Sequence, residues 1–325
     1  MAKSSIAKFR EKYLGKLTIK DPYSKTKWLS VRIRGYIDLL RAFTLLAPIV
    51  VSIFIMAASI IYNNASLQQN WWITIAHAAG TIAIVNAASN ALNQATDVQA
   101  DKISKPYRPI PLGIIRSDEA QSLAYILYLF ALLRSATINP WFGFFIFLIM
   151  IFTITYSLPP RMKKHLFINQ VWIAIPRGML GILASWSVFG DPFSPTPIII
   201  GAIATTYLIG GMATKDIVDS VADKQTGTKT LINTYGNKKT ALICFPFMFF
   251  PFIFIPIFFN HGLETYLWPL ILTVIPSFLI FFLMIRGTES QTLENVHAWS
   301  IMYIQYIFFI MVFSLLTIFH DVLPF

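Results

Sequence analysis

The chain has 325 residues, of which 56% are hydrophobic and 13% are charged, and its mean hydropathy is +0.62. An ordinary soluble domain carries about twice this charged fraction, so the composition excludes one and indicates a polytopic membrane protein. The formal net charge of +11 does not indicate a nucleic-acid partner, because the basic residues concentrate at the N-terminus and in alternate loops.

The chain begins with a basic segment. Eleven lysines and arginines fall within the first 41 residues, and residues 1–35 are predicted to form a basic cytoplasmic N-terminal segment. A secretory signal peptide is not expected, because the polar stretch is too long for its n-region and the first apolar stretch is too long for its h-region. Two roles remain open for the segment: attraction to anionic membrane lipids or docking of a partner protein.

Nine apolar stretches follow, each about as long as a helix that crosses a bilayer. Their ranges are 42–62, 71–93, 119–136, 141–158, 167–189, 197–214, 240–260, 266–285 and 298–319. Prolines inside the stretch 240–260 leave a kinked or re-entrant helix as an alternative there. The predicted fold is all-α, with nine transmembrane helices in a single domain over residues 36–325.

Positive charge is distributed unevenly between the loops. Lysine and arginine are frequent at 102–116, 161–164, 215–239 and near residue 286. The loops on the other side, at 63–70, 137–140, 190–196 and 261–265, contain neither, and Arg134 is the exception near that side. The chain is predicted to be a multi-pass protein of a cell or organelle membrane. Because cytoplasmic loops carry the excess of positive charge, its N-terminus and its active site are predicted to lie on the cytoplasmic side.

Two acidic clusters lie at the cytoplasmic ends of these stretches. They consist of Asn93, Asp97 and Asp101 in the first and of Asp216, Asp219 and Asp223 in the second. The spacings, i, i+4, i+8 and i, i+3, i+7, place each set on one face of a helix. Carboxylates that face one another repel, and Mg²⁺ relieves the repulsion while completing its shell with water and substrate phosphates. The clusters therefore predict a magnesium-bound phosphate at the membrane.

Basic residues near the clusters are candidate ligands for such a phosphate. Arg108 lies in a loop with three prolines, which are expected to keep the loop extended over the acidic residues. Lys163 and Lys164 close the fourth stretch, as phosphate ligands or as membrane anchors, and the sequence does not distinguish between the two lysines. Arg177 lies near the middle of the fifth stretch, where an unpaired arginine costs at least about 2.5–3.5 kcal/mol. It is expected to face a cavity or an acidic partner.

Several other patterns carry no function. Gly227-Thr228-Lys229-Thr230 lacks the earlier glycine and the preceding strand of a nucleotide-binding loop. The five histidines show no metal-ligand spacing, and the single cysteine, Cys244, excludes internal disulfides. A secondary transporter and a non-catalytic isoprenoid-diphosphate-binding protein remain alternatives, but a transporter is expected to carry its charges near the midplane of the membrane.

These motifs resemble those of a known family. The first cluster and the segment Pro106–Pro111 after it look like the first signature of the UbiA superfamily of intramembrane prenyltransferases. Lys215–Asp223, with Gly227 and Lys229–Leu231, is similar to the second signature. Tyr156–Pro160 also resembles the family, above all its chlorophyll-synthase-like and homogentisate-prenyltransferase-like branches. The resemblance covers roughly residues 36–320.

The resemblance implies an Mg²⁺-dependent enzyme that transfers an isoprenyl chain from a prenyl diphosphate donor to a lipophilic acceptor in a central cavity. Among the residues singled out above, it implies catalytic and metal-binding roles for Asp97, Asp101, Asp219 and Asp223, with Asn93 and Asp216 as further metal ligands. Donor diphosphate contacts fall to Asn93, Arg108, Lys163 and Lys164. Arg177, from its position in the fifth stretch, is predicted to contact the diphosphate as well. The acceptor is left open among a quinone precursor, a tetrapyrrole and a glycerol-phosphate ether lipid, as in archaeal digeranylgeranylglyceryl phosphate synthase-like members. No oligomeric state is predicted.

The chain departs from the family pattern at two places. Members often have Arg-Pro in the first span, whereas Arg41 is followed by Ala42 here. Many members also have Asn-Asp in the first signature, where this chain has Asn93-Gln94. The second change removes one acid and leaves the three spaced residues in place.

Overall fold

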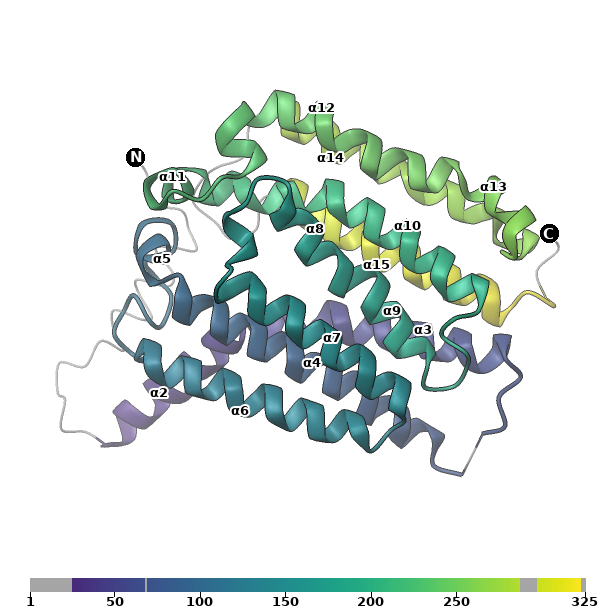
Figure 1. The fold of residues 1–325 in the computed structure, drawn as a ribbon, viewed down its shortest axis with the longest axis horizontal. Coiled ribbons are helices and arrows are strands. Elements are labelled where there is room, and N and C mark those ends of the chain that lie inside the picture. The colour runs from purple at the N-terminus through teal and green to yellow at the C-terminus, as the bar shows by residue number, and fades with distance from the viewer. Residues whose placement is uncertain (1–24, 68, 287–296, 323–325) are drawn as a thin grey trace.

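A computed structural model describes residues 25–67, 69–286 and 297–322. Over these residues the chain is helical and contains no strand, as the sequence predicts (Figure 1). Most of the predicted basic N-terminal segment, residues 1–24, lies outside the described residues, as do residues 287–296, which follow Arg286.

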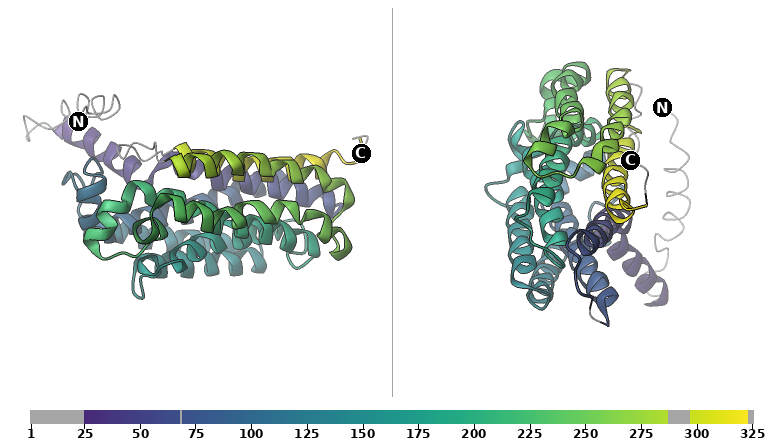
Figure 2. Two further views of the ribbon diagram at one scale, coloured as in Figure 1. Left: turned by 90° about the horizontal axis from the view of Figure 1, so that it is seen from above. Right: turned by 90° about the vertical axis from the view of Figure 1, so that its right-hand side faces the viewer.

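The longer helices run side by side along the long axis of the molecule (Figures 1 and 2). They are α2 (Lys25–Leu40), α3 (Leu46–Tyr62), α4 (Trp71–Thr96), α6 (Ser117–Ala136), α7 (Pro140–Ser157), α10 (Pro195–Gly211), α12 (Leu231–Ile253), α14 (Ile275–Arg286) and α15 (His297–Ile318). Shorter helices connect or extend them: η1 (Ala42–Leu45), α5 (Val98–Ser104), η2 (Met162–Lys164), α8 (Ile168–Ile175), η3 (Pro176–Leu180), α9 (Gly181–Trp186), η4 (Met212–Lys215), α11 (Asp216–Thr226), α13 (Ile255–Phe258), η5 (Phe259–His261) and η6 (Thr265–Val274).

The predicted count of nine membrane spans is not confirmed. Within the described residues, six helices are long and apolar enough to cross a membrane, or seven if α12 and the bent segment after it, at 47°, form one span. The predicted spans 119–136 and 167–189 are not among them. Polar residues at both ends of α6 reduce its hydropathy, and a wide helical turn at η3 separates α8 from α9.

The buried apolar side chains form two clusters. One joins α10, α12, α14 and α15 around residues such as Tyr207 and Phe309. The other joins α4, α6 and α7 around residues such as Leu92 and Phe142. Helices α3 and α9 contribute to both clusters, so they connect the two parts of the bundle.

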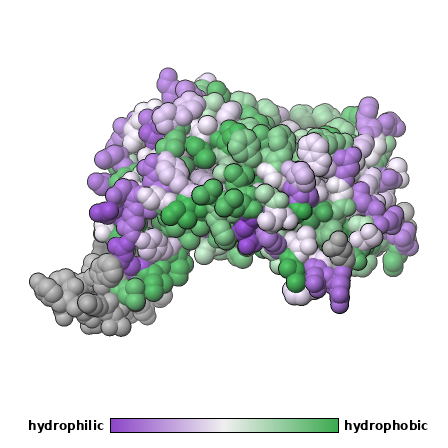
Figure 3. All heavy atoms as spheres, turned by 60° about the horizontal axis from the view of Figure 1, so that its bottom comes forward, coloured by the Kyte–Doolittle hydropathy of each residue, from purple (hydrophilic) through white to green (hydrophobic). Residues whose placement is uncertain are grey.

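The outer surface has the distribution expected of a membrane protein. On the face drawn in Figure 3, hydrophobic residues form a broad middle zone, and hydrophilic residues gather at the two ends. Exposed leucine, isoleucine and phenylalanine side chains are frequent on the spans, for example Phe144 and Phe147 on α7. Lipid rather than water is the natural neighbour of such a surface.

Both acidic clusters lie at the same end of the bundle. The chain turns from α4 into α5 and from α10 into α11 at the end where α2 also lies (Figure 1). Helices α5 and α11 pack against each other there, although they are separated by more than 100 residues of sequence. This packing brings the two predicted motifs together.

Candidate functional site

A pocket of about 600 Å³ opens between the two parts of the bundle. Its walls are apolar toward the middle of the bundle, with residues such as Val51, Ile149 and Leu208, and charged at the end where α5 and α11 meet. Five aspartates line it: Asp97, Asp101, Asp216, Asp219 and Asp223. Eight basic residues also line it: Arg41, Lys105, Arg108, Arg161, Lys163, Lys164, Arg177 and Lys215. The excess of positive charge favours an anionic ligand.

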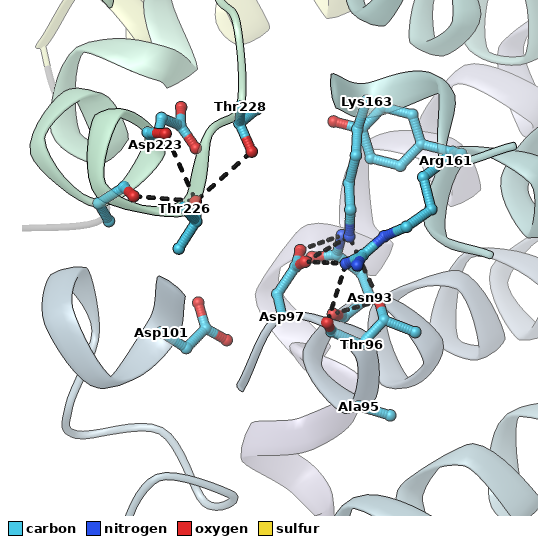
Figure 4. Close-up of polar contacts among 12 residues, drawn as sticks. Asn93, Ala95, Thr96, Asp97, Asp101, Arg161, Lys163, Asp223, Thr226 and Thr228 are labelled. Carbon is cyan, nitrogen blue, oxygen red and sulfur yellow. Dashed lines mark hydrogen bonds and ion pairs between the residues drawn. The ribbon is translucent and has the colours of Figure 1, made fainter. Parts of the chain in front are cut away.

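The first acidic cluster was predicted to lie on one face of a single helix, but the structure divides it between two helices. Helix α4 ends at Thr96, Asp97 has non-helical backbone angles, and α5 begins at Val98. The Asp97 carboxylate accepts a hydrogen bond from Asn93 Nδ2 at 3.0 Å and forms ion pairs with Arg161, at 3.2 Å, and Lys163. Both cations come from the connection between α7 and α8, and Figure 4 shows them beside Asp97. The kink therefore turns Asp97 toward a second element.

Asp101 is held by the proline-containing loop. Arg108 Nη1 lies 3.0 and 2.7 Å from the two carboxylate oxygens of Asp101. Both residues are buried, at 3% exposure for Asp101 and 6% for Arg108. Burial raises the pKa of the Asp101 carboxyl, and the positive charges of Arg108 and Lys105 act against that rise.

The loop that carries Arg108 differs from the expectation. The prolines were expected to keep it extended, but it folds into successive turns, with Arg108 N–H donating to Lys105 C=O at 3.0 Å and Leu112 N–H to Arg108 C=O at 3.1 Å. Proline also suits the corners of turns, where its fixed φ is pre-set. Arg108 still lines the pocket, as the prediction required.

The second acidic cluster lies on one short helix, α11, as predicted. Lys215 Nζ lies 2.7 Å from Asp216 Oδ1, and Lys105 forms an ion pair with Asp219. Within the described ranges, Asp223 has no ion pair, and it lies on α11, whereas Asp101 lies on α5 and Asp97 lies between α4 and α5 (Figure 4). The two motifs therefore contribute carboxylates from opposite walls of one pocket.

The structure separates the two neighbouring lysines that the sequence could not distinguish. Lys163 is 7% exposed and pairs with Asp97; burial lowers the pKa of Lys163, and the negative charge of Asp97 opposes the change. Lys164 also lines the pocket, and among the described residues its side chain makes no ion pair. Arg161, two residues before Lys163, has a left-handed backbone with φ 54°, and its guanidinium donates to Thr96 C=O at the end of α4 at 3.0 Å.

Sequence reasoning did not select several residues that complete the site. Lys105, Arg161 and Lys215 form ion pairs with aspartates there. The ammonium groups of Lys163 and Lys215 lie over the ring of Tyr156, and the Tyr156 hydroxyl is 3.3 Å from Lys215 Nζ. A signal for the lysines was present, because a buried carboxylate needs a cation and both Lys105 and Lys215 stand next to a motif. Nothing in the sequence indicated a role for Asn169, because it is 47 residues from Asp216 in the chain and comes within 3.5 Å of it only in the folded protein.

The segment Gly227–Thr230 has a local structural role, consistent with rejecting a nucleotide-binding loop. Gly227, with φ 73°, ends α11 in the left-handed conformation that glycine tolerates. The Thr230 side chain accepts from Asn233 N–H at 3.3 Å and the Asn233 side chain accepts from Thr230 N–H at 2.9 Å, a capping box that starts α12. The segment thus sets the direction in which the chain leaves the pocket.

The donor groups of the pocket suit a hard divalent cation. Its carboxylate and amide oxygens are the ligands that Mg²⁺ accepts. Asn169 Oδ1 is buried without a hydrogen-bond partner beside Asp216, so it is an oxygen whose hydrogen-bonding capacity is unused. Within the described residues, however, no three carboxylate, histidine or cysteine side chains stand close enough together to hold a metal by themselves. Coordination here would need a ligand that supplies further oxygens.

Comparison with known proteins assigns these features to a family. The model of the UbiA prenyltransferase family matches residues 44–318. Digeranylgeranylglyceryl phosphate synthase of Methanobrevibacter smithii is 25% identical over 249 residues, which cover 74% of this chain and 87% of that protein. A probable homogentisate phytyltransferase 2 of Oryza sativa subsp. japonica is 29% identical over 63% of this chain and 56% of its own length.

A solved structure has the same fold. It is that of a UbiA homolog from Archaeoglobus fulgidus bound to GPP and Mg²⁺, with a TM-score of 0.65 and 21% identity. The match covers 87% of this chain and 99% of that one.

Proposed function

The chain belongs to the UbiA prenyltransferase family and is a membrane prenyltransferase; we propose that its charged pocket binds a prenyl diphosphate donor through Mg²⁺ and transfers the prenyl group to a lipophilic acceptor. The observation that carries the proposal is the meeting of two acidic motifs, from α4–α5 and α11, across one pocket that is also lined by eight basic residues. Family membership favours this function over the transporter and the non-catalytic binder.

Mg²⁺ fits between the two walls of carboxylates. Asp97 and Asp101 would hold it on one wall and Asp219 and Asp223 on the other, with Asn93 and Asp216 as further candidates. The A. fulgidus homolog was solved with GPP and Mg²⁺, and GPP would bring the oxygens that the protein's own groups lack. When bound, Mg²⁺ would neutralise the negative charge that develops on the departing diphosphate.

The basic residues of the pocket would receive the diphosphate itself. Lys163 and Arg161 can transfer hydrogen bonds from Asp97 to diphosphate oxygens, and Lys105 can do so from Asp219. As the allylic C–O bond breaks, its electron pair passes to a diphosphate oxygen that these cations stabilise. Lys164 is available for the same purpose, because it makes no ion pair within the described part of the chain.

The apolar part of the pocket would hold the prenyl chain and exclude water. Val51, Ile149 and Leu208 line it below the charged end. A dry environment prevents water from capturing the electron-deficient allylic carbon before the acceptor attacks it. The π faces of Tyr156 and Tyr303, which also line the pocket, can stabilise developing positive charge there.

We place the charged end of the bundle in the cytoplasm and the protein in the membrane as a multi-pass enzyme. The support is the excess of lysine and arginine in the loops at that end, together with their absence from the opposite loops. The acceptors are drawn from the chemistry named for the relatives: a glyceryl phosphate ether or a hydroxylated aromatic ring.

The test is release of diphosphate from geranylgeranyl diphosphate by the full-length protein in lipid nanodiscs. Reactions would contain Mg²⁺ or EDTA and one of a panel of glyceryl phosphate, aromatic and tetrapyrrole acceptors, with Asp219→Asn as the inactive control. We expect release that requires both Mg²⁺ and one acceptor class. Donor binding without release for any acceptor would favour the non-catalytic binder, and failure to bind the donor would refute the proposal.

A further inference from the structure

Arg177 occupies a rigid and unusual turn in the bundle. Between α8 and α9, residues Pro176–Leu180 form a π-helical turn, in which Gly181 N–H donates to Pro176 C=O. Such wide turns recur at functional sites, because they redirect a side chain that a regular helix would place elsewhere.

Neighbouring helices fix this turn from two sides. Met179 N–H, which the wide turn frees, donates to Thr205 Oγ1 on α10 at 2.7 Å. The hydroxyl of Tyr306, on α15, donates to Arg177 C=O at 2.8 Å. The backbone position of Arg177 is therefore set by two other helices.

The side chain of Arg177 lines the pocket and lacks a carboxylate partner. Its guanidinium lies 5.7 Å from the centre of the Tyr303 ring, and among the residues that the structure describes no aspartate or glutamate forms an ion pair with it. Arg41 lines the same pocket and is close enough for its positive charge to act on Arg177. By contrast, Lys105, Lys163 and Lys215 are each paired with an aspartate. Positive charge at Arg177 is thus left to be balanced by a ligand.

Arg177 stands deeper in the bundle than the aspartates. Asn169, which contacts Asp216, lies in the first turn of α8, and Arg177 follows it by eight residues. Eight residues advance a helix by about 12 Å. The backbone of Arg177 is therefore about two helical turns deeper along the pocket wall than Asn169, the residue that contacts Asp216.

From this arrangement we infer that Arg177 binds an anionic group of the acceptor, a phosphate or a carboxylate, and so selects acceptors that carry one. The inference rests on the proposed function and moves Arg177 from the donor diphosphate, where the sequence analysis placed it, to the acceptor. A guanidinium suits this role because its planar fork can donate two parallel hydrogen bonds to either oxyanion, and its flat face packs on an aromatic ring such as Tyr303.

The test measures acceptor binding without donor, by thermal shift of the full-length protein in nanodiscs. One probe pair is geranylgeranylglyceryl phosphate and geranylgeranylglycerol; the other is homogentisate and methylhydroquinone, which lacks the carboxylate. For one of the two pairs, the wild type is expected to bind the anionic acceptor with a Kd at least about thirtyfold lower than that of the neutral acceptor, which is the size of effect expected for a buried pair of opposite charges. Arg177→Gln is expected to remove the preference and Arg177→Lys to retain part of it. The pair that discriminates identifies phosphate or carboxylate.

Donor binding separates this inference from the proposed function. Geranylgeranyl diphosphate with Mg²⁺ is expected to bind wild type and Arg177→Gln with the same Kd. The matched control, Arg134→Gln, removes an arginine of α6 that hydrogen-bonds Thr81 and does not line the pocket, and it is expected to keep the acceptor preference.

Equal loss of donor binding in Arg177→Gln, no preference in the wild type for either pair, or the same loss of preference in Arg134→Gln would each overturn the inference. A wild type that distinguishes the acceptors but binds no donor would instead refute the proposed function.

Discussion

Gly178 is the residue at which the structure makes its sharpest stability prediction. It lies in the π turn beside Arg177, where α10 approaches closely. A Cβ at Gly178 would stand 2.4 Å from Thr205 Oγ1 and 2.7 Å from both Cα and N of Thr205. Two of these atoms are backbone, so a side-chain rotation cannot relieve the contact. Gly178→Ala must therefore push η3 and α10 apart.

The size of the effect follows from two opposing terms. Overpacking of this kind costs about 1–3 kcal/mol, whereas alanine gains roughly 0.5–1 kcal/mol over glycine inside a helix. The net expectation is a loss of about 1–2 kcal/mol, since the contact is with backbone. Separation of the helices would also break the 2.7 Å bond from Met179 N–H to Thr205 Oγ1 and shift Arg177. Acceptor KM is expected to rise more than donor KM.

The assay is thermal unfolding of the purified protein in one detergent, followed by acceptor and donor titrations. Gly143→Ala is the matched control, because it adds the same methyl group inside helix α7, where the nearest atoms, in Ala136 and Ser135, are 3.8 Å away. Gly143→Ala should leave Tm unchanged or raise it slightly. If Gly178→Ala matches Gly143→Ala in Tm and in acceptor KM, the close approach of η3 and α10 is not real.

Three other predictions concern the pocket and its support. Asp97→Asn, which keeps the shape of the side chain, should reduce transfer by about a hundredfold or more, measured as turnover at saturating donor per folded protein, because loss of the ion pair with Lys163 also lowers Tm. Lys163→Met should reduce the free energy of unfolding by about 1–3 kcal/mol, because it removes a buried partner of Asp97. Lys164→Met should change the free energy of unfolding by less than about 0.5 kcal/mol and should weaken donor binding. Equal effects of the two substitutions in thermal unfolding and in donor titration would contradict the separation of their roles. Asn139→Ala, which removes the acceptor for Phe142 N–H at 2.8 Å at the start of α7, should cost about 0.5–2 kcal/mol in unfolding with no change in either KM.

The sequence predicted the helical class and the position of both acidic motifs at one end of the bundle, because both follow from the pattern of apolar and charged residues along the chain. Apolar length and the spacing of the aspartates are properties of single segments, and the packing of α5 on α11 then brings the two motifs to one pocket. The kink at Asp97 was not predictable, because Asp97 makes no side-chain capping bond that would start α5. Its carboxylate is turned by Lys163 and Arg161, more than 60 residues away.

The same limit explains the membrane spans. Nine apolar stretches were visible in the sequence, but the fifth contains Pro176, Arg177 and Gly178, and its course depends on where the backbone N–H groups of a widened turn find an acceptor. The acceptor for Met179 N–H is Thr205 Oγ1, on another helix. A proline in the sequence can therefore signal a break without saying whether the helix kinks, ends or widens into a π turn.

The division of charge in the pocket leads to an order of binding. Most of the cations near the two acidic motifs, Lys164 excepted, are already paired with aspartates, so this end of the pocket can accept a metal and a diphosphate together with little change in net charge. Arg177 lies deeper in the pocket and has no aspartate or glutamate partner among the described residues. An anionic acceptor that bound before the donor could occupy either end of the pocket, because the lysines at the charged end can exchange their aspartate partners for the acceptor's anion. Once the donor diphosphate occupies the charged end, only the site at Arg177 remains for the acceptor's anion. We therefore expect the donor to bind first, and initial-rate kinetics with both substrates varied would reveal a random or reversed order if this reasoning fails.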